Sequence, residues 1–226
     1  MYLPTQLLLI NIQPLELIKD YLQRHTYIME AKFEELIEGF VTGNIGISET
    51  FLSLQLAEAL QQNLLRLKRD SRMVSAGIGN AQVKDKNQKV RGDKTCWLDT
   101  NTRNDAEMEF LDIIRQFMGH LNKTCFTGLN ACEFHYALYE EGTFYSKHRD
   151  QLKNDYNRKF SMISYLNKDW VESDGGQLII HRDEATENIL PNNQKAIFFQ
   201  SDIIEHEVAI ATRPRMSVTG WLKRVN

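Results

Sequence analysis

Cysteine is scarce in this chain of 226 residues, and its spacing argues against two kinds of site. The three cysteines, Cys96, Cys125 and Cys132, are odd in number and form no C-x-x-C motif. This pattern favours neither a disulfide framework nor a zinc site built from thiolates. We therefore expect a reduced chain and place the protein in the cytoplasm.

Long hydrophobic runs are also missing, since no stretch approaches the roughly 20 apolar residues of a membrane span. A short apolar run lies near the start, but no basic segment precedes it and no small-residue cleavage site follows it. The formal net charge of -3 gives no electrostatic reason to expect a nucleic acid partner. The sequence thus predicts a protein that binds neither membrane nor nucleic acid, and it leaves the oligomeric state open.

The first half of the chain has the periodicity of helices. Residues 30–41 repeat apolar side chains at i, i+3 and i+4, which is typical of an amphipathic helix. Further helices are expected in residues 50–70, which end in basic side chains, and in residues 104–122, which begin with acidic ones. The apolar stripe of the last helix, which indicates packing into a core, consists of Phe110, Ile114, Phe117 and Leu121.

The second half consists of short segments in which apolar and polar residues alternate between turn signals. Because no helical pattern separates these segments, we expect a sandwich, a barrel or a jelly roll. No repeat or convincing linker divides the chain, so one large domain is the expected organisation. The expected strands lie in residues 132–139, 160–167, 175–181, 195–200 and 216–223.

The polar segment TFYSKHRDQLKN places His148 and Asp150 two residues apart. In an extended strand both side chains leave the same face. His206 lies between two expected strands, and two histidines with one carboxylate form the facial triad that holds non-haem Fe(II). Structural zinc more often has a fourth protein ligand, frequently a thiolate, and no cysteine is nearby in the sequence. The alternative is that these are solvated loop residues, because H-x-D is a common motif.

The last expected strand carries an arginine on an inward-facing position. Arg215, Ser217, Thr219 and Trp221 alternate along one face of this strand. A buried arginine is costly unless an anion meets it. Because a guanidinium binds a carboxylate through two parallel hydrogen bonds, a cosubstrate with a carboxylate is expected.

Six motifs follow one another from about Val90 to Trp221: VRGDKTCWLD, YEEGTFYSKHRD, ISYLNKDW, GGQLII, FFQSDIIEHEV and ATRPRMSVTGW. In this order they resemble the 2-oxoglutarate and Fe(II)-dependent oxygenases, specifically the prolyl 4-hydroxylase branch with the hypoxia-inducible-factor prolyl hydroxylases and their bacterial relatives. The resemblance implies an α+β fold, with a double-stranded β-helix (jelly roll) core supported by N-terminal helices. Residues 1–45 would form a helical segment and residues 46–226 the dioxygenase domain, with helices 50–70 and 104–122 packing on the jelly roll.

The same resemblance implies roles for individual residues. The iron ligands would be His148, Asp150 and His206, with no catalytic side chain beyond the metal centre. The residues that bind 2-oxoglutarate would be Arg215, Tyr165, Tyr139 and Ser217. Residues that contact the substrate or belong to a lid over it would be Arg91, Asp93 and Trp97.

Three alternatives stay open at this point. Arg213 shares the strand parity of Arg215, although the spacing to His206 and Trp221 favours Arg215. Residues 76–97 match the position of a loop that folds over substrate in the prolyl hydroxylases, and the alternative is an ordinary solvated hairpin. His135 could face the pocket or be a hydrogen-bonded histidine of the core.

The function implied by the resemblance is hydroxylation of a proline in a protein or peptide. Fe(II) and 2-oxoglutarate would be the cofactors and O2 a cosubstrate, with ascorbate as a further candidate. Two other hypotheses are a hydroxylase of another side chain or a small metabolite, and a non-catalytic barrel that binds a metal or a partner.

Overall fold

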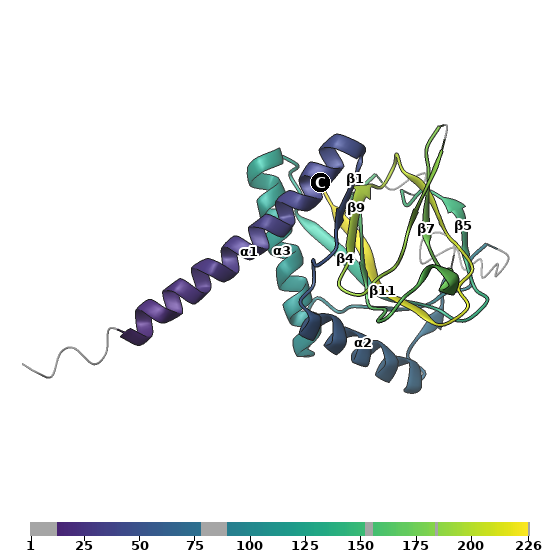
Figure 1. The fold of residues 1–226 in the computed structure, drawn as a ribbon, viewed down its shortest axis with the longest axis horizontal. Coiled ribbons are helices and arrows are strands. Elements are labelled where there is room, and N and C mark those ends of the chain that lie inside the picture. The colour runs from purple at the N-terminus through teal and green to yellow at the C-terminus, as the bar shows by residue number, and fades with distance from the viewer. Residues whose placement is uncertain (1–12, 78–89, 152–155, 184, 226) are drawn as a thin grey trace, which may run out of the picture.

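The computed structural model describes residues 13–77, 90–151, 156–183 and 185–225. Two antiparallel β-sheets face each other, and helices cover the outer face of the larger sheet (Figure 1). This is a jelly-roll core supported by helices, which confirms the predicted fold class. No helix within the described ranges combines the length and the apolar character needed to cross a membrane.

The helices are α1 (Gln13–Gly43), α2 (Leu54–Arg69) and α3 (Asp105–Cys125), with a short 3-10 helix at Glu172–Asp174. The larger sheet has the strand order β1-β9-β6-β11-β4-β3-β2 and the smaller one the order β5-β10-β7-β8. Strands of the larger sheet are β1 (Ile45–Ser48), β2 (Val74–Ser75), β3 (Lys94–Trp97), β4 (Ala131–Tyr139), β6 (Arg158–Tyr165), β9 (Ala196–Gln200) and β11 (Arg215–Lys223). Strands of the smaller sheet are β5 (Tyr145–His148), β7 (Leu178–His181), β8 (Thr186–Ile189) and β10 (Glu205–Val208).

The helices begin and end where local chemistry favours it. Ser53 caps α2 by accepting a hydrogen bond from the backbone N–H of Leu56, and Asn104 caps α3 in the same way through Glu107. The predicted stripe of α3 is buried along its whole length, with Phe110, Ile114 and Phe117 fully covered. The stripe therefore fixes which face of α3 meets the sheet.

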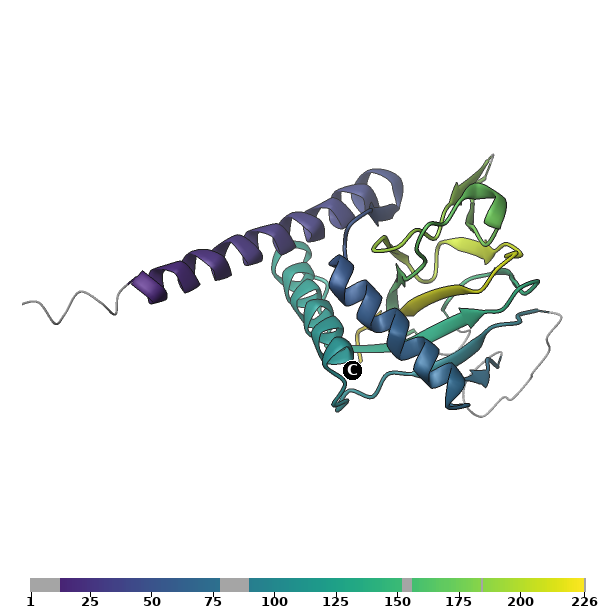
Figure 2. The same cartoon turned by 60° about the horizontal axis from the view of Figure 1, so that its bottom comes forward.

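The long helix α1 extends away from the body of the protein at its N-terminal end (Figure 2). Its 31 residues span about 46 Å at 1.5 Å per residue. Phe33 and Leu36 near its C-terminal end are buried in the same core as α2 and α3, whereas Leu17 is exposed. The C-terminal part of α1 thus shares the core of the domain, and the division of the chain at residues 45 and 46 stays a prediction.

Alternation along the strands of the larger sheet creates two separate cores. On β4, Phe134, Tyr136 and Leu138 pack against the helices. Ala137 and Tyr139 point instead into the space between the two sheets. Because successive side chains leave opposite faces, one strand serves both the packing of the helices and the lining of an interior cavity.

Candidate active site

The two predicted histidine ligands lie directly opposite each other in the smaller sheet. His148 ends β5, and His206 on β10 is its antiparallel partner. Asp150 follows two residues after His148, and its carboxylate lies 3.5 Å from Nε2 of His148 and 3.8 Å from Nε2 of His206. One potential ligand atom from each residue lies within 4.8 Å of the others. The structure therefore brings together all three residues that the sequence singled out as a metal triad.

Backbone carbonyl groups fix the orientation of both imidazole rings. Nδ1 of His148 lies 2.7 Å from the carbonyl oxygen of Ser146, and Nδ1 of His206 lies 3.2 Å from that of Ile204. Because a carbonyl oxygen can only accept, Nδ1 carries the proton in each ring, and Nε2 keeps the lone pair that a metal ion between the three residues would take. Hydrogen bonds of this kind orient histidine ligands in metal sites.

Burial sets the charge states within the triad. It lowers the pKa of His206 to about 4, so this imidazole is neutral at physiological pH. Burial by itself would raise the pKa of Asp150, but the neighbouring imidazoles of His206 and His148 and a hydrogen bond from Ser161 bring it well below its ordinary value. A neutral imidazole and an ionised carboxylate are the forms that bind a metal ion.

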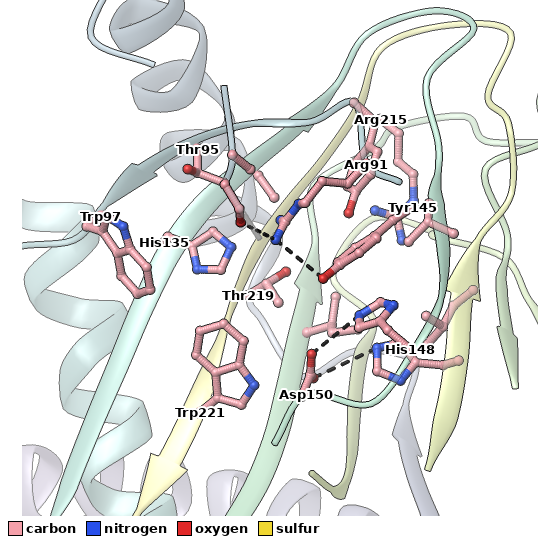
Figure 3. A pocket seen from close by; sticks show the side chains of 18 of the residues that line it. Arg91, Thr95, Trp97, His135, Tyr145, His148, Asp150, Arg215, Thr219 and Trp221 are labelled. Atoms are coloured by element: carbon pink, nitrogen blue, oxygen red, sulfur yellow. Dashed lines mark hydrogen bonds and ion pairs between the residues drawn. The ribbon is translucent and has the colours of Figure 1, made fainter. Parts of the chain in front are cut away.

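The triad opens into a cavity of about 550 Å³ between the two sheets (Figure 3). The volume is in the range of sites that enclose small molecules. Leu178, Val208 and Ile163 contribute apolar parts of its lining. Polar and aromatic side chains complete the lining, and they come from strands of both sheets and from the loops beside them.

Arg215 lies in this cavity and is 1% exposed. Its Nε donates a hydrogen bond of 2.8 Å to the carbonyl oxygen of Gly176. Its Nη2 and the hydroxyl of Tyr165 are both buried and have no hydrogen-bond partner within the described part of the chain. Burial raises the pKa of Tyr165, so its hydroxyl stays neutral and able to donate. A buried cation beside a free hydroxyl fits the carboxylate of an organic acid such as 2-oxoglutarate.

The other two residues expected at the 2-oxoglutarate site differ in their surroundings. The ring of Tyr139 lines the cavity, and the guanidinium carbon of Arg215 lies 5.0 Å from its centroid. Ser217 is 1% exposed, and its hydroxyl lies 3.0 Å from that of Thr219. Tyr139 therefore lies in the cavity beside Arg215, whereas the hydroxyl of Ser217 already has a protein partner.

Arg213, the alternative to Arg215, differs from it in its contacts. Arg213 forms a 2.9 Å ion pair with Asp174 and donates a 2.7 Å hydrogen bond to the carbonyl of Asp169. Its guanidinium carbon also lies 4.4 Å from the centroid of a Trp170 ring. Arg213 thus belongs to a partly exposed turn outside the cavity.

Of the three residues expected to contact the substrate or form a lid, Arg91 and Trp97 line the cavity, and Asp93 forms an ion pair with Arg91. Arg91 donates two hydrogen bonds of 2.7 Å to the carboxylate of Asp93, which is 2% exposed. Its guanidinium carbon lies 4.2 Å from the centroid of the Tyr145 ring. Trp97 lines the cavity and is 54% exposed. Residues 78–89, on which the lid hypothesis also depends, lie outside the described residues.

Sequence reasoning missed Arg158, which supports both sides of the cavity. Its guanidinium carbon lies 3.4 Å from the centroid of a Trp221 ring, and its Nη1 donates a 3.3 Å hydrogen bond to the backbone carbonyl of Asp150. Glu133 on β4 pairs with its Nε at 2.9 Å. No motif marks this position, because all these contacts depend on how distant strands pair.

Comparisons with known proteins agree with this site. The family model described as "2OG-Fe(II) oxygenase superfamily" matches residues 134–223, which include both histidines and the aspartate. Egl nine homolog 1 of Rattus norvegicus is 28% identical over 187 residues, covering 78% of this chain and 54% of the relative. The protein of the same name from Homo sapiens is 28% identical over 187 residues, which cover 43% of its length. The chain thus spans about half the length of these curated relatives.

Solved structures resemble the whole fold. A prolyl-4-hydroxylase from Pseudomonas putida has a TM-score of 0.77 and 29% identity, and the match covers 86% of this chain and 100% of that one. A prolyl hydroxylase from Trichoplax adhaerens, solved with a peptide fragment of the hypoxia inducible factor oxygen degradation domain, has a TM-score of 0.79 and 21% identity over 88% of this chain and 92% of that one. The model of the 2OG-Fe(II) oxygenase superfamily thus covers the triad, and the chain is similar in sequence and in fold to a bacterial prolyl-4-hydroxylase.

Proposed function

We propose that the protein is an Fe(II)- and 2-oxoglutarate-dependent dioxygenase that hydroxylates a prolyl residue of a protein or peptide. The observation that carries this proposal is the presence of two complementary groups in one cavity. The triad of His148, Asp150 and His206 offers three ligands to a metal ion. Arg215, in the same cavity, has a buried nitrogen without a partner in the described part of the chain.

When bound, Fe(II) and 2-oxoglutarate supply the oxidation, in which one atom of O2 enters a C–H bond and the other enters succinate, with release of CO2. The chain's own residues hold and orient these groups. His148 and His206 would present Nε2 to the metal, while Arg215 and the hydroxyl of Tyr165 would hold a carboxylate of 2-oxoglutarate. The apolar lining would exclude water from the reacting groups.

The relatives support a prolyl residue in a peptide as the target. The Pseudomonas putida enzyme, which the chain covers over its full length, is a prolyl-4-hydroxylase. The Trichoplax adhaerens enzyme was solved with a peptide fragment bound. The open side of the cavity beside Trp97, which is 54% exposed, would give a peptide access to the triad.

Mass spectrometry of peptides from cells with and without the protein tests this proposal. We expect a proline with a mass increase of about 16 Da, the mass of one oxygen atom, only where the protein is present. The purified protein should release succinate in a reaction that requires both Fe(II) and the peptide that carries this proline. The variant His148→Ala, which removes one expected ligand, is the control and should release none.

The other hypotheses give different results in the same assays. Turnover of free amino acids or other small metabolites, with none on peptides, would identify a small-molecule hydroxylase. A mark on a side chain other than proline would keep the dioxygenase and change its target. A purified protein that binds neither Fe(II) nor 2-oxoglutarate would refute the enzymatic proposal.

We also propose that the protein acts in the cytoplasm and uses ascorbate as an auxiliary reductant. The three free cysteines suit a reducing compartment. Fractionation of cells that contain the tagged protein tests the first point. The second is tested by the number of turnovers before activity is lost, which should rise with added ascorbate.

A further inference from the structure

One buried histidine of the cavity has no role in the site described above. His135 on β4 is 5% exposed and lines the same cavity as the triad. Its Nδ1 has no hydrogen-bond partner among the described residues. Leaving a buried polar nitrogen unpaired costs about 1–3 kcal/mol, so such an atom in a ligand cavity points to a partner supplied by the ligand.

The pairing of strands explains why His135 faces the cavity. It lies opposite Trp97 on β3 and opposite Thr219 on β11. The centroid of its ring lies 4.8 Å from that of Trp97 and 5.6 Å from that of Trp221. These three rings lie along one side of the cavity, across from His148 and Asp150 (Figure 3). We call Trp97, His135 and Trp221 the aromatic wall.

The charge state of His135 restricts what it can bind. Burial lowers its pKa to about 4, so the imidazole is neutral and carries one N–H donor and one acceptor nitrogen. A half-turn of the ring about the Cβ–Cγ bond exchanges its two edges, so either nitrogen can be turned to the cavity. The indole N–H of Trp221, which can only donate, is also buried without a partner in the part of the chain that the structure describes. The aromatic wall therefore offers hydrogen-bond donors.

A prolyl peptide has the complementary chemistry. Proline has no backbone N–H, so the main chain beside it presents carbonyl oxygens in excess of donors. A flat apolar ring with neighbouring acceptors suits a wall of aromatic rings that carries free donors. Resting on the function proposed above, we infer that His135 is a specificity-determining residue, whose imidazole donates a hydrogen bond to a main-chain carbonyl oxygen beside the target residue.

Binding of a defined peptide tests this inference without turnover. The probe is the pentapeptide acetyl-Ala-Ala-Pro-Ala-Ala-amide, added to full-length protein loaded with Zn(II) and 2-oxoglutarate and labelled with ¹⁵N in its histidines. We expect the imidazole nitrogen signals of His135 to shift as the probe binds, because a new hydrogen bond forms there. A probe in which alanine replaces the proline should bind more weakly.

Three variants separate the hydrogen bond from simple packing. His135→Leu has similar bulk and no donor, and it should bind the probe roughly 3-fold to 10-fold more weakly, the loss expected for one neutral hydrogen bond. His135→Gln keeps an N–H donor and should recover part of this loss. His181→Leu is the matched control, because His181 lies on β7 beside Glu207 at 3.4 Å and is not part of the cavity lining. It should bind the probe as the wild type does, and all variants should retain the wild-type affinity for 2-oxoglutarate.

The possible results distinguish this inference from the function on which it rests. Hydroxylation of the probe with equal binding by wild type, His135→Leu and His135→Gln would overturn the role of His135 and leave the enzyme intact. Shifted His135 signals without hydroxylation of any proline would refute the prolyl target and keep the hydrogen bond. Absence of binding by either peptide would overturn the inference outright.

Discussion

Replacing Arg215 with methionine should separate the binding of 2-oxoglutarate from the stability of the fold. Arg215 is 1% exposed, and no acidic side chain within the described residues forms an ion pair with it. Methionine has similar length and packs well among apolar side chains. The variant loses the hydrogen bond from Nε to Gly176, but it also removes a buried charge that lacks a counter-ion. We therefore expect the protein without 2-oxoglutarate to keep its stability.

The expected loss of affinity for 2-oxoglutarate follows from the hydrogen-bond donors of Arg215 that no described residue uses. Hydrogen bonds between a charged donor and a carboxylate contribute about 1.5–3 kcal/mol. A two-pronged contact therefore loses about 3 kcal/mol, which weakens binding roughly 100-fold. Tyr165 keeps its hydroxyl in the variant, but a neutral donor cannot replace the charge.

Thermal unfolding of the Zn(II)-loaded protein measures this effect. At a 2-oxoglutarate concentration of about 100 times the wild-type Kd, the ligand should stabilise the wild type by about 2.7 kcal/mol and the variant by about 0.4 kcal/mol. For a protein of this size each kcal/mol corresponds to about 2–4 °C in Tm. The ligand should thus raise the Tm of the wild type by roughly 5–11 °C and that of the variant by only about 1–2 °C.

Arg213→Met is the matched control, since it removes the same kind of side chain two residues away and outside the cavity. Its ion pair with Asp174 is partly exposed, so we expect a small loss of stability and an unchanged response to 2-oxoglutarate. An Arg215→Met protein that responds to 2-oxoglutarate as the wild type does would refute the assignment. A loss of response in Arg213→Met instead would show that the wrong arginine had been chosen.

Three further predictions concern the metal centre and its surroundings. Asp150→Asn removes the negative charge of the triad, so Zn(II) affinity measured by calorimetry should fall by more than the roughly 10–100-fold that loss of an outer partner costs, and unchanged affinity would exclude Asp150 as a ligand. His206 and His135 each have a pKa of about 4 in the folded protein against about 6.5 when unfolded, so the unfolded chain binds more protons between these values. In urea unfolding without metal, the free energy of unfolding should therefore be highest above about pH 6.5 and fall by about 3 kcal/mol per histidine as the pH approaches 4. The fall should be smaller in His135→Leu, and an equal fall in this variant and the wild type would contradict the burial argument. Gly176→Ala places a side chain where φ is +65°, with its Cβ 3.1 Å from Cδ of Arg215. It should therefore cost about 1–2 kcal/mol of stability and weaken the binding of 2-oxoglutarate. Wild-type affinity for 2-oxoglutarate would mean that Arg215 moves freely.

Most of the local structure could be predicted from the sequence because it depends on periodicity. The stripe of α3 and the alternation on β11 report which faces are buried, and these faces are the ones that the structure covers. The triad was also accessible, since His148 and Asp150 lie two residues apart and His206 follows a strand. Arg215 could be favoured over Arg213 from its spacing to His206 and Trp221, and its burial then distinguishes the two in the structure.

The contacts that depend on pairing between distant strands could not be predicted. The placement of Arg158 between Trp221 and Asp150 requires the register of β6 against β11. Whether His135 is hydrogen-bonded or free depends on which side chains surround it from three strands. The sequence likewise indicated a helix in residues 30–41 but not the length of α1, whose described apolar side chains Leu17, Tyr27 and Ile28 are exposed.

Successive residues of β11 face opposite sides of the sheet, and the two sides have different surroundings. Arg215 and Thr219 line the cavity, while Val218 and Leu222 pack in the core that contains the helices. Substitution of Val218 or Leu222 should change the stability of the fold and leave the lining of the cavity unchanged. Insertion of one residue after Arg215 would exchange the two faces of the strand beyond it. Apolar side chains would then point into the cavity, and polar ones would point toward the helices. Strand β11 should therefore tolerate many substitutions but no insertion or deletion of a single residue.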